Sequence, residues 1–396
     1  MAARGEPLSD QHRGLPQNDG VYRKRQGPGA GKRNDPGNGE ENMIRVTIID
    51  DRIENERLSY PAVTEHLSYL TEKEKDQEKP GHGTWIAQIL LRYAKTPVCI
   101  TNLQILYDAD VPVNLDRLTE ALKWCAEHET PDIIMISAAS IDLYEEQELH
   151  EAIRRNTARG TVILAAGDNR QYRAVPACYP EVIGVCCDKR KRLQPGTYAV
   201  VKDDPIGIDV IANCDTEEDE EEPLCRQNRG KYINAETKEI PSNSYAVPVA
   251  AAVVCGLLKK GKREKEEILQ KLDRMSDRCN DQMEYALPKD SEDEQIRIRF
   301  VTGKDLTEDT CITLARECHD RYGYDTLIIG TGDKETPPYV IDRNQLDRWG
   351  MDLPAFLQRH FQTEMVWLLE NGKKTNNASI KKAIQNRISK NVLWRI

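Results

Sequence analysis

The chain has 396 residues, of which 39% are hydrophobic, and a formal net charge of −10. The length and the hydrophobic content predict a large protein with two folded units. The charge argues against a nucleic-acid-binding protein, because a phosphate backbone calls for a basic surface. No apolar run approaches the ~18 residues of a membrane-spanning helix and no signal sequence follows Met1, so we expect a soluble, cytoplasmic protein without membrane contact.

The first predicted unit follows a polar tail. Residues 1–42 are rich in Gly, Pro, Asn and charge, and this composition predicts disorder. Helix-like and strand-like runs then alternate through residues 43–261: helical spacing at 115–126 precedes a strand at 133–136, and an amphipathic stretch at 145–159 precedes a strand at 162–165. This alternation predicts an α/β fold, with a mostly parallel sheet and helices on both faces.

The second predicted unit lies beyond a charged helix and linker at 262–295. Strand-like and helix-like runs resume over 296–396, enough for a small α+β or α/β domain of its own. We expect this C-terminal domain to bind a partner or the substrate. Its predicted strands are Ile296–Val301 and Thr326–Ile329, and its predicted helices lie near Glu308–Tyr322, Leu353–Asn371 and Ser379–Lys390.

Three polar residues stand at the edges of predicted elements. Asp50 ends the apolar β-branched run 46–49, His82 lies between two glycines at the start of an apolar helix, and Ser244 opens a small-residue helix with Pro248 in its first turn. Such a set suits nucleophilic catalysis, because a Ser hydroxyl needs a base to take its proton and a His can accept it and return it. An Asp can fix the tautomer of that His and stabilise its cationic form.

The chain order Asp, His, Ser is that of the subtilisin type. From about Ile44 to Lys260 the sequence resembles the subtilisin-like serine peptidases, or subtilases, in six ordered segments. The resemblance implies a subtilisin-like fold and a serine endopeptidase that acts on a peptide or protein substrate. It assigns the triad to Asp50, His82 and Ser244. The six segments are 46–51, 82–84, 132–137, 160–169, 175–185 and 242–248.

The resemblance also implies the substrate cleft. One wall would be the segment Ser137, Ala138, Ala139 and Ser140, whose backbone would pair with an extended substrate. The opposite wall of the first specificity pocket would be Ala165, Ala166 and Gly167. Small residues there leave room for a large substrate side chain. The sequence does not assign the residues of the pocket rim, which would set the preference for that side chain.

The oxyanion donor has two candidates. Matching Ala-Ala-Gly to the family's Ala-Gly-Asn gives Asp168, and counting along the strand from Gly160 gives Asn169. We favour Asn169, because side-chain alternation fixes a strand's register and an ionised Asp would repel the oxyanion. Asp168 remains the alternative, since some proprotein convertases carry Asp at this place and Asp50-Asp51 is similar to their Asp-Asp pair.

Other features leave alternatives open. Ser242-Asn243 and Tyr245 depart from the family's Gly-Thr and Met, which leaves room for a catalytically silent pseudopeptidase that acts as a peptide-binding or scaffold module. We expect neither a metal nor a cofactor. The acidic run 216–222 fits a solvated insertion, a calcium-binding loop or a negatively charged segment that attracts a basic substrate. The 11 cysteines, odd in number and without a Cys-x-x-Cys pair, predict reduced thiols.

Overall fold

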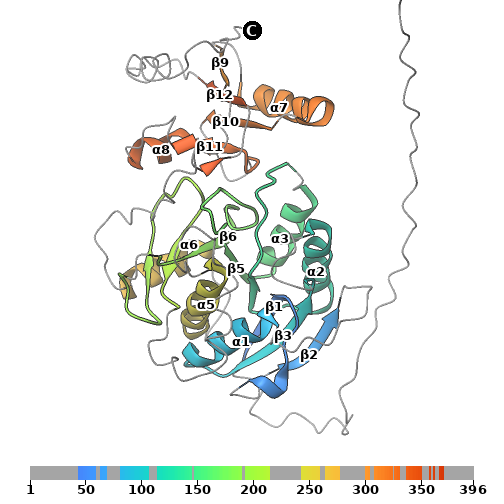
Figure 1. Ribbon diagram of the computed structural model, residues 1–396, viewed down its shortest axis with the longest axis vertical. Helices are drawn as coiled ribbons and strands as arrows, with labels where there is room; N and C mark the ends of the chain where they lie inside the picture. Colours follow the sequence, from blue (N-terminus) through green and yellow to red (C-terminus); the bar gives the residue numbers. More distant parts are fainter. Residues whose placement is uncertain are drawn as a thin grey trace, which may run out of the picture.

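The computed structural model describes residues 43–58, 63–68, 81–106, 114–144, 147–189, 192–214, 242–258, 264–276, 299–303, 307–323, 325–330, 336–349, 356–357, 360–361 and 365–369. In these residues a large unit is built on an eight-stranded sheet and a small unit on a four-stranded sheet (Figure 1). The predicted division points near 43, 261 and 296 fall at or beside residues outside these ranges, so the domain limits stay a prediction.

The large sheet has the strand order β2-β3-β1-β4-β5-β6-β8-β7. Every neighbouring pair is parallel except β7 with β8. The predicted mostly parallel α/β sheet is therefore confirmed. Its strands are β1 (Ile44–Asp50), β2 (Val63–Ser68), β3 (Val98–Gln104), β4 (Ile133–Ile136), β5 (Val162–Ala166), β6 (Val182–Cys187), β7 (Tyr198–Val200) and β8 (Val210–Ala212).

Helices cover both faces of this sheet (Figure 1). Side chains of α1, α5 and α6 share one buried cluster, and those of α2 and α3 share another. No helix in the described ranges is long and apolar enough to cross a membrane. The helices are α1 (His82–Tyr93), α2 (Leu115–His128), α3 (Gln147–Ala158), α5 (Ala246–Leu257) and α6 (Lys265–Met275), with 3-10 turns η2 (Asn55–Arg57) and η4 (Asn243–Tyr245).

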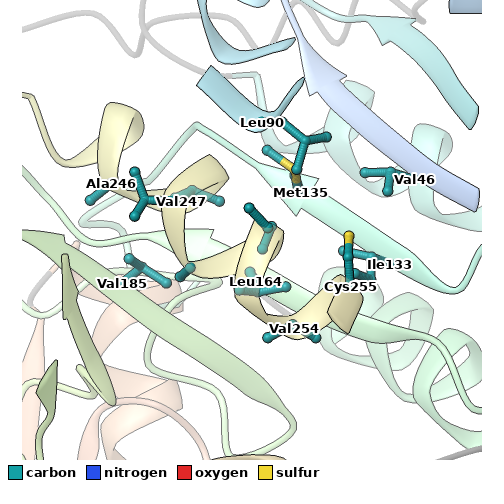
Figure 2. Close-up of a cluster of buried hydrophobic side chains, with 14 of the residues drawn as sticks. Val46, Leu90, Ile133, Met135, Leu164, Val185, Ala246, Val247, Val254 and Cys255 are labelled. Carbon is teal, nitrogen blue, oxygen red and sulfur yellow. The ribbon is translucent and has the colours of Figure 1, made fainter. Parts of the chain in front are cut away.

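The central strands are buried on both faces, which explains their unbroken apolar runs. In β5, Leu164 packs with α5 on one face while Ile163 packs with α2 and α3 on the other. Figure 2 shows the labelled side chains of α5, among them Val247 and Cys255, gathered with Leu164 and Met135 of the strands. The small residues of α5 let this helix lie close to the sheet, and Ser244 lies in the turn immediately before it.

The small unit is a parallel sheet of order β11-β10-β12-β9 in the described residues. Helix α7 begins where Thr307 accepts a hydrogen bond from the Thr310 N–H and ends at Gly323, whose φ of +65° suits a glycine. These caps reproduce the predicted helix. The elements are β9 (Arg299–Gly303), α7 (Glu308–Tyr322), β10 (Thr326–Gly330), β11 (Val340–Asp342), α8 (Arg343–Trp349) and β12 (Met365–Leu369).

One element of the small unit was predicted wrongly. Within the predicted helix Leu353–Asn371, residues Met365–Leu369 form strand β12, which pairs with β10 on one side and β9 on the other. A short apolar run fits a buried strand as well as a helix, and strand pairing decides between them here. The predicted strand at 296–301 is observed from Arg299, and the predicted helix at 379–390 lies outside the described residues.

A third buried cluster joins the two units. It combines Ile206, Ile208 and Ile211 of the large unit with residues of α7, β10 and β11 of the small one. Tyr144, which follows β4, is central to it: its hydroxyl accepts from the Thr326 N–H at 3.0 Å, and its ring stacks on those of His319 and Tyr339 at 4.5 and 4.2 Å. Burial raises the pKa of the Tyr144 hydroxyl well above its ordinary range. The small unit is thus packed against the large one rather than loosely tethered.

Candidate active site

The sequence folds so that Asp50, His82 and Ser244 meet. Asp50 is the last residue of β1, His82 the first of α1, and Ser244 lies in η4 immediately before α5. The glycines flanking His82 permit a close approach of α1 to the end of β1. A Cβ on Gly83 would lie 2.4 Å from the Asp51 carbonyl oxygen, and one on Gly81 would lie 2.6 Å from that of Arg52.

The three side chains form a continuous hydrogen-bonded row. His82 Nδ1 lies 2.8 and 3.0 Å from the two carboxylate oxygens of Asp50, and His82 Nε2 lies 3.0 Å from Ser244 Oγ. Because an ionised carboxylate only accepts, Nδ1 carries the proton and Nε2 presents its lone pair to the serine hydroxyl. Asp50 is fully buried and Ser244 is 5% exposed, so the row is shielded from bulk water.

A second hydroxyl, that of Ser242, contacts the nucleophile candidate. Ser242 Oγ lies 2.9 Å from Ser244 Oγ, and the Asn169 amide donates to Ser242 Oγ at 3.2 Å. If Ser244 donates to His82, it can accept from Ser242, which can accept from Asn169. Asn169 Oδ1 also lies within reach as an acceptor, at 3.3 Å from Ser242 Oγ, so the single proton of Ser242 serves either that oxygen or Ser244 Oγ. Ser242, a departure from the family's motif, thus connects Asn169 to the nucleophile candidate.

The ring of Tyr245 lies near the imidazole of His82. Its ring centroid is 5.3 Å from that of His82, with the planes tilted by 33°. An aromatic face at this distance favours a cationic partner, so it suits an imidazole that gains a proton during a reaction.

The two oxyanion candidates have different surroundings. Asn169 Oδ1 accepts from the Asn243 N–H at 2.8 Å, which turns its amide nitrogen toward Ser242. Asp168 Oδ1 accepts instead from the backbone N–H groups of Arg170 and Tyr172, at 2.9 and 3.4 Å. Asn169 thus contacts Ser242 and Asn243, the two residues before Ser244, whereas the carboxylate of Asp168 accepts from the backbone of the loop that follows it.

Two supporting residues were missed by sequence reasoning. The Asn243 amide donates to the carbonyls of Gly167 and Asp168, and its oxygen accepts from the Cys187 N–H at 3.0 Å. Lys189 Nζ donates to the Asn169 carbonyl at 2.5 Å, and burial lowers the pKa of this lysine. Asn243 stood out only as a departure from the family motif, and nothing in the sequence marked Lys189.

The residues predicted to form the cleft walls follow neighbouring strands. Ser137 comes directly after β4, and Ala165 and Ala166 are the last residues of β5. Ser140 exchanges two 2.9 Å backbone hydrogen bonds with Val175, which ties the first wall to the segment beyond the second. Ala138, Ala165 and Ala166 are buried, so their side chains pack into the cores and the backbone is what they can offer a substrate. Gly167 packs closely, since a Cβ there would lie 2.7 Å from Ile208 Cδ1 and would require that side chain to shift.

The described residues contain no group of three or more His, Cys, Asp or Glu side chains that could hold a metal ion. The acidic run 216–222, the candidate calcium loop, lies outside them.

Asp51 is a second buried carboxylate beside the row. Its side chain accepts from the backbone N–H groups of Arg52, at 2.6 Å, and of His82, at 3.2 Å. Burial raises the pKa of Asp51 to about 6, and the neighbouring charge of Asp50 adds to the rise, while these hydrogen bonds oppose it. The Asp51 carboxyl therefore loses its proton at a pH of about 6.

Asp51 predicts a pH dependence of stability. Its folded pKa of about 6 lies above its ordinary value of 3.8, so the protonated form favours folding. The contribution is complete below about pH 4 and is lost as the pH rises through about 6, amounting to about 3 kcal/mol. In urea unfolding from pH 4 to 7 we expect Asp51→Asn to lack this loss. The exposed Asp116→Asn should keep it, and identical profiles for the two variants would contradict the assignment.

Comparison with known proteins gives matches to solved structures. No family profile matches the sequence, and no curated protein matches it. A cold-adapted subtilisin-like serine proteinase is 16% identical, with a TM-score of 0.42 over 61% of this chain and 85% of that chain. The nisin leader peptidase NisP from Lactococcus lactis is also 16% identical, with a TM-score of 0.39 over 59% and 84%. The prenylagaramide maturation protease PagA is 16% identical, with a TM-score of 0.36 over 59% and 78%.

Proposed function

We propose that this chain is a serine endopeptidase of the subtilisin type, in which Asp50, His82 and Ser244 hydrolyse peptide bonds through an acyl-enzyme. The observation that carries the proposal is the hydrogen-bonded row: 2.8 Å from Asp50 to His82 Nδ1 and 3.0 Å from His82 Nε2 to Ser244 Oγ. These distances are within the reach that proton transfer from a nucleophile to its base requires.

In the first half of the reaction, Ser244 Oγ attacks the scissile carbonyl carbon while His82 Nε2 takes the hydroxyl proton. Asp50 holds the imidazole in the tautomer with Nδ1 protonated and stabilises its positive charge. His82 then gives its proton to the departing amine, and the acyl group stays on Ser244. Water attacks this ester in the second half, with His82 again as the base.

The charge that develops on the carbonyl oxygen needs donors of its own. We propose the Asn169 amide and the backbone N–H of Ser244, which lies in the turn before α5. The Asn169 amide is already oriented, because its oxygen is held by the Asn243 N–H. A donor fixed before the reaction costs no reorganisation during it, so it stabilises the transition state more than a mobile one would.

The substrate would be an extended peptide or protein segment that pairs with the backbone of residues 137–140, with 165–167 opposite. We propose a processing role in the cytoplasm, since an enzyme with an added C-terminal unit suits a dedicated substrate better than bulk digestion. That unit would take part in binding the substrate or a partner.

A fluorophosphonate probe tests the proposal. Such a probe reacts with an activated serine, so we expect the folded chain to be labelled on Ser244, as mapped by mass spectrometry, and to hydrolyse peptides. Heat-unfolded protein serves as the control and should not be labelled. A folded chain that resists the probe and leaves all peptides intact would favour the pseudopeptidase alternative.

A further inference from the structure

The loop that carries Asn169 has an unusual backbone. The Gln171 N–H donates to the Asp168 carbonyl at 2.9 Å, closing a tight turn that contains Asn169. Gln171 adopts a φ of +69°, in the left-handed region, and its side chain is buried. A glutamine is rarely found with this φ, and such a conformation persists only where surrounding contacts impose it.

His360 of the small unit supplies two of these contacts. Its Nδ1 lies 2.6 Å from the Gln171 carbonyl oxygen, and its own carbonyl accepts from the Arg173 N–H at 3.0 Å. Because a carbonyl only accepts, Nδ1 must carry the proton and donate. His360 is 1% exposed, so water does not compete strongly for these bonds. One residue thus forms hydrogen bonds with the backbone on both sides of Tyr172.

The Arg173 side chain forms hydrogen bonds with the small unit and with a second segment of the large unit. Its Nε donates to the Pro338 carbonyl of the small unit at 2.8 Å, and its Nη1 donates to the Pro205 carbonyl at 2.7 Å. Pro205 belongs to the turn that leads to Ile208, whose side chain covers Gly167. The segment after Asn169 is therefore fixed by the small unit, while Asn243 holds the carbonyls of the two residues before it and Lys189 holds the Asn169 carbonyl itself.

We propose that His360 is a positioning residue for the oxyanion donor: by holding Gln171 and Arg173 it keeps the loop in the conformation that aims the Asn169 amide at the site. The inference rests on the proposed function and deepens it, because it makes the C-terminal unit part of the catalytic arrangement. His360 acts through the loop and does not itself touch the substrate.

The effect should fall on turnover. An oxyanion contact is made mainly in the transition state, so a shifted Asn169 lowers kcat and leaves KM little changed. Misplacement of a catalytic group by a fraction of an ångström to 1 Å costs about 10- to 100-fold, and we expect that loss in kcat for His360→Ala.

Conservative variants separate a specific hydrogen bond from general packing. His360→Asn keeps an N–H close to the position of Nδ1 and should retain kcat within about threefold of the wild type. His360→Gln places its N–H one bond farther out and should behave like His360→Ala. This pair carries the test even if the alanine variant folds poorly. His319→Ala, which removes a ring stacked on Tyr144 at the same junction, should leave kcat unchanged.

A double-mutant cycle tests the role of the backbone. Glycine adopts positive φ without strain, so a loop with Gln171→Gly needs less external support. The loss of kcat caused by His360→Ala should therefore be smaller in the Gln171→Gly background than in the wild type. An equal loss in both backgrounds, or full kcat in His360→Ala, would overturn the proposal.

Hydrogen exchange separates this inference from the proposed function. We expect His360→Ala, and not His319→Ala, to speed exchange of the amides in 168–173, whether or not the chain hydrolyses peptides. An inactive wild type with this exchange pattern would refute the peptidase and leave the positioning intact. Unchanged exchange in His360→Ala would refute the positioning even in an active enzyme.

Discussion

Replacing Ser244 with alanine is expected to abolish both peptide hydrolysis and fluorophosphonate labelling. The substitution removes the hydroxyl oxygen that lies 3.0 Å from His82 Nε2. Without it no acyl-enzyme can form, and we expect kcat to fall by about 10⁶-fold, to the background that binding and the oxyanion donors supply. Single-turnover peptide cleavage and probe labelling measure the loss directly.

The fold should survive this change. Ser244 is a small side chain in the turn before α5, and the apolar contacts that hold α5 on the sheet do not involve its hydroxyl. Circular dichroism and the urea midpoint should match those of the wild type. Ser276→Ala, at the end of α6, provides a matched serine control with full activity. Turnover at the wild-type level in Ser244→Ala would show that the nucleophile lies elsewhere.

Much of the large unit was predictable because local pattern and global fold agree in it. The apolar runs of β1, β4 and β5 are buried on both faces, and the spacing of Leu118 and Leu122 places both on the buried side of α2. The sequence predicts that His82 opens a helix between two glycines, but the close approach of these glycines to Asp51 and Arg52 is seen only in the structure. The meeting of Asp50, His82 and Ser244, across 32 and 162 residues of sequence, was predictable only from their motifs and chain order.

The rest depended on contacts that no local pattern encodes. Lys189 reaches the Asn169 carbonyl only because β6 lies beside β5, and a lysine at a strand end is ordinarily a solvated charge. His360 contacts Gln171 across 189 residues, through the packing of one unit on another. The helix predicted over Leu353–Asn371 includes strand β12, because five apolar residues fit either element and only the pairing with β9 and β10 decides between them.

Replacing Asn169 with alanine is expected to lower kcat by about 10²- to 10³-fold while KM changes little. The reason is that the amide hydrogen bond to the oxyanion strengthens as charge develops and contributes little to the bound substrate. The amide nitrogen lies 3.2 Å from Ser242 Oγ, which lies 2.9 Å from Ser244 Oγ, so the amide is held beside the nucleophile candidate. Steady-state kinetics with a fluorogenic peptide separate the two parameters.

Asp168 provides the matched control for this prediction. Asp168→Asn keeps an oxygen that can accept from the Arg170 and Tyr172 N–H groups, so the loop should hold and kcat should stay near the wild-type value. Asp168→Ala removes that oxygen and should cause a milder loss than Asn169→Ala, through loosening of the loop. A severe loss in Asp168→Ala together with near-normal kcat in Asn169→Ala would reverse the assignment. The oxyanion would then be served by Asp168, as in the convertase-like arrangement, and a carboxyl that donates there would have to be protonated.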